Sequence, residues 1–147
     1  MGFTQVEGVD YETTFASVMT TKTFRILLAI WNNFPSLCFE HWDVKTAFVN
    51  APLKEKVYCR QIPGFETPGK EGKIMLLKKA LYGTKQAANA WQNFLASILL
   101  SIGGKKHPKD ECVYIFREGE AFLFLATHVD DLFPLFNTQA IKIKIKF

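Results

Sequence analysis

The sequence has little cysteine and no long apolar run. Its cysteines, Cys38, Cys59 and Cys112, are odd in number and show no Cys-x-x-Cys spacing, so neither a disulfide framework nor a zinc ribbon is indicated. The three histidines have no paired spacing with one another or with cysteine that would indicate a structural zinc site. No stretch reaches the roughly 20 apolar residues of a membrane span, and no signal peptide opens the chain. We therefore expect a soluble, intracellular protein with no membrane partner.

Large apolar side chains are abundant. Of the 147 residues, 48% are hydrophobic and 14% aromatic, including 14 phenylalanines, which suits one globular domain or a large part of one. The net charge of +4 is compatible with a polyanionic partner but is common among proteins without one. Composition alone therefore leaves the function class open.

Two adjacent carboxylates, Asp130 and Asp131, separate two apolar runs at residues 121–126 and 132–136. This pattern predicts a strand, a turn and a second strand, with both acids at the turn near solvent. Aspartate is also favoured at turns for structural reasons alone, and for any isolated pair of aspartates this purely structural role remains the alternative. A third acid, Asp43, ends another strand-like run at residues 37–42 and could join the pair. Three close carboxylates repel one another strongly and are tolerated chiefly when divalent cations, most naturally Mg²⁺, neutralise them.

The remaining chain mixes helical and strand patterns. Helices are predicted from Thr20 or Thr21 to Trp31, and over residues 85–102, where apolar residues trace one face. Strands are predicted at residues 37–44 as a central, buried strand, at 55–61 as an exposed strand, at 74–77 as a short buried strand, and at 112–116 and 121–125 as a hairpin.

Two features predict irregularities. Pro134 places its strand at an edge or a bulge, or makes it short and distorted. The tail, residues 141–147, alternates isoleucine and lysine, which predicts an edge strand or a cationic extension.

Five blocks carry a resemblance to a known family. They are residues 2–11 (GFTQVEGVDY), 43–48 (DVKTAF), 61–65 (QIPGF), 77–87 (LKKALYGTKQA) and 128–131 (HVDD). In this order they resemble the reverse transcriptase domain of Ty1/copia-type retrotransposon polyproteins over residues 1–136, leaving 137–147 as a truncated or divergent tail. The family usually has Tyr at the position of His128 and Pro at the position of Ala88.

The resemblance implies an α+β fold, a polymerase palm with an antiparallel sheet and helices packed on one face. It also implies partial fingers, with no thumb or ribonuclease H domain and with the basic segment that precedes the first block missing. The implied activity is RNA-directed DNA polymerisation by two-metal nucleotidyl transfer, with two Mg²⁺ ions, or Mn²⁺ in their place, as cofactors. Asp43, Asp130 and Asp131 are the implied catalytic residues, and Val44 joins them as a metal ligand.

The other implied site residues bind the substrates. Phe48 lies under the sugar of the bound deoxynucleoside triphosphate, where its ring would exclude a ribose 2′-hydroxyl; from the residues alone, a core residue is the favoured interpretation of Phe48. Gln86 joins it in binding the nucleotide. The implied contacts with the RNA template and DNA primer come from four residues, His128, Val129, Lys85 and Asn89.

Two function classes follow from the resemblance. The first is the catalytic domain of a retrotransposon reverse transcriptase, cytoplasmic or associated with virus-like particles. The alternative is a decayed or repurposed remnant that binds nucleic acid without polymerising, which the missing basic segment, His128 and Pro134 favour. An unrelated α+β protein with structural turn carboxylates is the third class, and the five ordered blocks argue against it.

Overall fold

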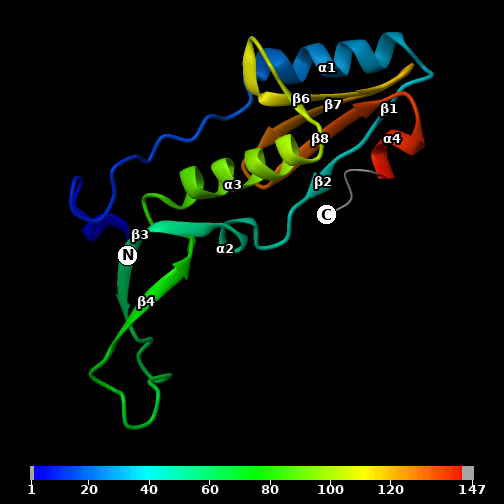
Figure 1. The fold of residues 1–147 in the computed structure, drawn as a ribbon. Helices are drawn as coiled ribbons and strands as arrows, with labels where there is room; N and C mark the ends of the chain where they lie inside the picture. Colours follow the sequence, from blue (N-terminus) through cyan, green and yellow to red (C-terminus); the bar gives the residue numbers. More distant parts are fainter. Residues whose placement is uncertain (1, 144–147) are drawn as a thin grey trace. The chain divides into compact units, whose positions relative to one another are not determined.

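The computed structural model describes residues 2–143, and the chain separates into two compact units (Figure 1). The first unit comprises the chain up to Phe15 together with Thr46–Trp91. The second comprises Ala16–Lys45 and the chain from Gln92 onward. Helix α3 (Ala87–Ser101) begins in the first unit and continues into the second. No helix in the described part of the chain is both long enough and apolar enough to cross a membrane.

The first unit is built on a two-stranded antiparallel ribbon, which consists of β3 (Pro52–Arg60) and β4 (Ile74–Lys79). A short 3-10 helix, η1 (Gly2–Thr4), and a one-turn helix, α2 (Ala47–Asn50), accompany it. Both strands occur where the sequence predicts strands. The predicted burial of residues 74–77 is wrong, because Ile74, Met75 and Leu76 are 62%, 40% and 49% exposed. A ribbon of two strands has no further layer to cover them.

The second unit is an antiparallel sheet with strand order β1-β8-β7-β6-β5, in which β2 also pairs with β8. Its strands are β1 (Cys38–Phe39), β2 (Trp42–Asp43), β5 (Lys105–His107), β6 (Asp110–Glu118), β7 (Ala121–His128) and β8 (Asp131–Phe136). Strands β6 and β7 form the predicted hairpin around Gly119, whose φ is +56°. A glycine tolerates this left-handed conformation because it has no Cβ.

Helices cover both faces of this sheet, so the expectation of helices on one face is wrong (Figure 1). Helix α1 (Thr21–Asn33) lies over one face, where its Phe24 ring meets Phe133 of β8 edge-on at 5.0 Å. The end of α3 lies over the other face. Gly104 lies between the helix and the sheet there, because a Cβ on it would touch both the Leu99 backbone of α3 and the Phe116 ring of β6. Neighbouring residues of β7, such as Leu125 and Ala126, are both buried. Apolar side chains on both faces of a strand require a layer on each side.

The predicted strand at residues 37–44 is split and lies at the sheet edge, not at its centre. Strands β1 and β2 contain two residues each, and both pair with β8. Between them, the N–H of Glu40 donates to the Pro134 carbonyl at 3.1 Å. In an antiparallel strand the backbone nitrogen and oxygen of one residue face the same neighbouring strand. The Pro134 nitrogen therefore faces this interruption too, and it has no hydrogen to donate to the neighbouring strand. The distortion expected in the strand of Pro134 thus appears in the adjacent strand, which is split into β1 and β2, while β8 itself stays regular.

The helix predictions are confirmed for α1 and α3. Thr20 is the N-cap of α1, and its side chain accepts a hydrogen bond from the Thr23 N–H, as its residue type predicts. The tail prediction is wrong within the described residues, because Gln139–Ile143 form a short helix, α4. Ile141 is buried, at 3% exposure. Residues 144–147 of the predicted edge strand lie outside the described residues.

Candidate active site

The backbone of the second unit brings the predicted catalytic residues to one end of its sheet. Asp43 of β2 lies directly opposite Asp131 of β8, and the Val44 N–H donates to the Asp130 carbonyl at 2.9 Å. Residues directly opposite each other in an antiparallel pair have Cβ atoms about 4.5–5.5 Å apart. Asp43, Val44, Asp130 and Asp131 are therefore neighbours, although nearly 90 residues of sequence separate them.

Asp130 lies in a tight turn that joins β7 and β8. His128 pairs with Asp131 across the hairpin, which leaves Val129 and Asp130 as a two-residue turn. The predicted strand-turn-strand is confirmed, but only Asp130 lies in the turn, because Asp131 is the first residue of β8. Val129 has a φ of +56°. A positive φ at the first turn residue is typical of the type II′ turn, which normally has glycine there. A β-branched residue in this conformation costs about 1–3 kcal/mol, and such strain concentrates at functional sites.

His41 is the functional neighbour that the sequence prediction missed. Its Nε2 lies 2.6 Å from Asp131 Oδ1, and its ring stacks on Phe133 at a centroid distance of 5.0 Å and an angle of 12°. His41 precedes Asp43 by two residues, so strand alternation puts both on the face that carries Asp131. The two-residue spacing between His41 and Asp43 was the signal in the sequence that could have indicated this neighbour. The imidazole holds one oxygen of a carboxylate on which the predicted chemistry depends.

The side chains of the three acids are not arranged as a metal site. Within residues 2–143 no group of three or more His, Cys, Asp or Glu side chains is gathered closely enough to hold an ion. Carboxylate oxygens are the donors that Mg²⁺ prefers, so the residue types suit the cation. The arrangement does not, since the Asp131 carboxylate is turned to His41.

A carboxylate on the other side of β2 ties this edge of the sheet to α4. Glu40 accepts a hydrogen bond from the Trp42 indole at 2.7 Å and pairs with Lys142 at 2.6 Å. The Lys142 ammonium also lies 5.9 Å from the centroid of the Trp42 ring. The hydrogen bond from Lys142 is the main cause that lowers the pKa of Glu40 below its ordinary value. We call Glu40, Trp42 and Lys142 the edge brace; it holds the strand that carries Asp43.

We expect a Lys142→Met variant to lose about 1 kcal/mol of unfolding free energy at pH 7, because the brace pair is mostly sheltered from water. A carboxyl whose pKa is lowered by folding stabilises the protein above its unfolded pKa, and this contribution disappears as the pH falls through the folded pKa. The difference between variant and parent should therefore shrink from just below pH 4.5 downward, measured by urea unfolding at each pH. Lys22→Met, an exposed change on α1, is the control. A pH-independent difference would contradict the role of Glu40.

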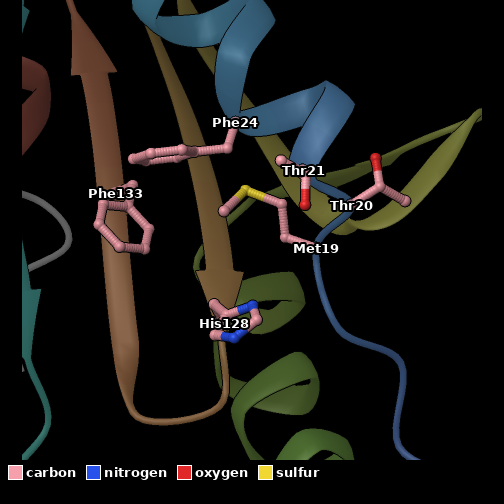
Figure 2. A pocket seen from close by; sticks show the side chains of 6 residues that line it. All are labelled: Met19, Thr20, Thr21, Phe24, His128 and Phe133. Atoms are coloured by element: carbon pink, nitrogen blue, oxygen red, sulfur yellow. The ribbon is translucent and has the colours of Figure 1, made fainter.

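His128 lines an open pocket of about 200 Å³ (Figure 2). Its other lining residues are Met19, Thr20, Thr21, Phe24 and Phe133. Figure 2 shows the imidazole at the end of β7, below Met19 and beside the turn to β8. The pocket is smaller than the roughly 300–1,000 Å³ of most small-molecule sites. His128 is thus exposed at an opening close to the acids, and its contact with a primer stays a prediction.

The predicted nucleotide-binding residues lie in the first unit. Phe48 is half-buried, and its ring stacks on Tyr82 at a centroid distance of 4.4 Å and an angle of 21°. Tyr82, which is 47% exposed, was not among the predicted site residues. Gln86 is only 2% exposed; its side chain accepts a hydrogen bond from Gln5 at 3.0 Å and donates one to the Asp10 carbonyl at 3.2 Å. Its amide groups therefore hold the N-terminal segment.

Lys85 and Asn89 lie beside Gln86 at the start of α3. The Lys85 N–H donates to the Gln5 side chain at 2.8 Å, and the lysine itself is exposed. The Asn89 side chain donates to the Phe15 carbonyl at 2.6 Å. Of these residues, Lys85 offers its side chain most openly to a ligand.

Comparison with known proteins places the chain in a family. The family described as reverse transcriptase (RNA-dependent DNA polymerase) matches residues 1–145, and the chain belongs to this family. Its relatives are copia-type Pol polyproteins. The chain is 35% identical over 146 residues to the retrovirus-related Pol polyprotein from transposon TNT 1-94 of Nicotiana tabacum. It is 34% identical over 133 residues to the corresponding polyprotein from transposon RE1 of Arabidopsis thaliana.

The similarity covers most of this chain and little of its relatives. The TNT 1-94 match includes 99% of the chain and 11% of that polyprotein, and the RE1 match 89% and 9%. The Ty1-DR4 Gag-Pol polyprotein of Saccharomyces cerevisiae is 28% identical over 132 residues, which are 84% of the chain and 8% of the polyprotein. No solved structure is significantly similar to the chain.

Proposed function

We propose that the chain is an RNA-directed DNA polymerase, extending a DNA primer on an RNA template with deoxynucleoside triphosphates. The observation that carries this proposal is the register of β2 and β8, which sets Asp43 opposite Asp131 beside the strained turn at Asp130. Membership of the reverse transcriptase family supports it. In this proposal the second unit supplies the catalytic end of a palm, and the first unit supplies part of the fingers.

Each predicted site residue has a role in the proposal. Asp43, Asp130 and Asp131, with Val44, would hold two Mg²⁺ ions only after the Asp131 carboxylate turned away from His41, its hydrogen-bond partner here, and the bound metal would supply charge stabilisation for nucleotidyl transfer. The Phe48 ring, which stacks on Tyr82, would face the sugar and favour deoxynucleotides. Two residues near the acids, His128 and Val129, would contact the primer end. Gln86 would act by positioning, since its amide is engaged with Gln5, while Lys85 and Asn89 would face the template.

A second candidate function is a remnant that binds nucleic acid without polymerising. The hydrogen bond between His41 and Asp131 favours it, because it engages one of the three carboxylates. The strained turn at Val129 favours catalysis instead, since a structural hairpin gains nothing from a valine at positive φ. Both proposals place the chain inside the cell, free or within virus-like particles. Both also divide it into a reverse transcriptase fragment, residues 1–136, and a tail, residues 137–147.

Primer extension decides between the two functions. We expect the folded chain to add dTTP to oligo(dT) on poly(rA) with Mg²⁺ or Mn²⁺, and to stop when EDTA removes the metal. The same sample should be tested for binding of the primer–template by fluorescence anisotropy. Binding without extension in a monodisperse, folded sample would overturn polymerisation and leave the remnant.

A further inference from the structure

One oxygen of the Asp131 carboxylate is already engaged by a neighbouring side chain. Asp131 Oδ1 lies 2.6 Å from His41 Nε2, although the two residues are 90 positions apart in the chain. A carboxylate has no hydrogen to give, so the imidazole is the donor, with its hydrogen on Nε2. Hydrogen bonds to a charged group are stronger than those between neutral groups. Any ligand that needs this oxygen therefore has to compete with the imidazole.

Ring packing holds the imidazole in place for this hydrogen bond. His41 lies between β1 and β2, and its ring stacks on Phe133 of β8 at a centroid distance of 5.0 Å and an angle of 12°. Phe133 is fixed in turn, because the rings of Phe24 and Phe39 lie 5.0 and 6.3 Å from it. A side chain that is already ordered by packing loses little further freedom when it donates a hydrogen bond.

The His41–Asp131 pair is also open to solvent. The two side chains are 58% and 40% exposed. Contacts between exposed groups are weaker than buried ones, because water competes for both partners. The pair is therefore ordered enough to form and exposed enough to be opened by a ligand from solution.

We propose that His41 is a positioning residue that holds the Asp131 carboxylate out of the metal site until a divalent cation displaces the imidazole. We call the hydrogen-bonded pair of His41 and Asp131 the latch. The proposal rests on the metal site of the proposed function, but it does not depend on polymerisation. The register already places Asp43 opposite Asp131, so the change that opens the latch is a turn of side chains and not a new pairing of strands.

The latch weakens cation binding without removing a ligand from the site. The apparent dissociation constant is the intrinsic constant divided by the fraction of molecules that are competent to bind. A latch that is open in about one molecule in ten therefore weakens the apparent affinity about tenfold. A hydrogen bond that served only to stabilise this edge of the sheet would leave the affinity for the cation unchanged.

The test is binding of Mn²⁺ alone to the full chain, followed by the decrease in the electron paramagnetic resonance signal of the free ion. Mg²⁺ is measured by competition with Mn²⁺. His41→Phe keeps an aromatic ring that can pack on Phe133 but removes the donor to Asp131. We expect this variant to bind Mn²⁺ about tenfold more tightly than the parent. Circular dichroism checks that it folds.

A second histidine provides the matched control. His107 lies in β5, at the opposite end of the strand order from β1, so it is remote from the acids. His107→Phe makes the same chemical change as His41→Phe and should leave the affinity for Mn²⁺ within about twofold of the parent. A similar gain in both variants would overturn the proposal, since the gain would then not depend on the contact with Asp131.

A nuclear magnetic resonance measurement follows the imidazole itself. In protein labelled with ¹⁵N-histidine, the His41 signals are those that His41→Phe lacks. Saturating Mg²⁺ should shift the His41 Nε2 signal, because its acceptor leaves, and should leave the His107 signals in place. A role for His41 in stability alone predicts no such shift, so an unmoved His41 signal at saturation would overturn the latch.

The outcomes separate this proposal from polymerase activity. Unchanged or weaker Mn²⁺ binding by His41→Phe would overturn the latch, even if the parent extends a primer. Tighter Mn²⁺ binding by His41→Phe would support the latch, even if neither chain extends a primer, and polymerisation alone would then fail.

Discussion

Replacing Asp130 and Asp131 together by asparagine should abolish primer extension, with a loss of roughly 10³-fold or more. Asparagine keeps the shape of each side chain but removes both negative charges from the end of the sheet. Charge stabilisation by a metal at such a site contributes several kcal/mol to lowering the barrier, and about 1.4 kcal/mol corresponds to a factor of ten in rate. The measurement is incorporation of labelled dTTP on poly(rA)/oligo(dT), with parent and variant at equal concentration.

The control for this variant removes the same charge from a second hairpin of the sheet, β6–β7. Glu118 and Glu120 flank Gly119 at the β6–β7 turn and are exposed. Glu118→Gln with Glu120→Gln should leave extension within about twofold of the parent. Residual extension by the Asp130→Asn, Asp131→Asn variant near the parent's rate would show that these carboxylates do not carry the reaction.

The largest effect on stability is expected for Phe136→Ala. Phe136 is fully buried in β8, where it pairs with Leu123 of β7 and with Cys38 of β1. Removing a buried phenylalanine ring costs about 3–5 kcal/mol, because apolar contact is lost and a cavity remains. Whole domains are stable by only about 5–15 kcal/mol, so the variant should unfold at a much lower urea concentration. Circular dichroism during a urea titration gives the free energy of unfolding.

An exposed phenylalanine provides the matched comparison. Phe65 lies in the loop between β3 and β4 and is 83% exposed. Because its ring is already in water, Phe65→Ala should change the free energy of unfolding by less than about 0.5 kcal/mol. If Phe136→Ala lost no more than Phe65→Ala, the packing described for β8 would be wrong.

Local signals in the sequence predicted most of the elements and the carboxylate turn. The Thr20 cap, the apolar period of α3 and the aspartates between two apolar runs are each contained in a few neighbouring residues. Such signals act through the backbone of the segment itself. The local structure that they predict therefore forms in the folded chain wherever contacts with distant segments do not favour another structure.

The features that were missed depend on partners far away in the chain. His41 meets Asp131 across 90 positions, and Glu40 meets Lys142 across 102. The spacing of His41 and Asp43 indicates a shared face, but neither local segment shows which distant side chain lies there. The alternating tail was wrong for a related reason: within α4, Ile141 is buried and Lys142 reaches Glu40, so tertiary contacts outweighed a strand-like pattern.

The interruption opposite Pro134 also affects how copies of the chain can meet. An uninterrupted edge strand is a template to which a strand from another molecule can add, and such pairing begins many aggregates. Here the edge beyond β8 consists of two pieces of two residues each, β1 and β2, separated at Glu40. Very short edge strands are one of the features by which natural sheets limit such pairing. By interrupting the pairing with β8, the proline thus leaves only short strands at the edge beside the carboxylates.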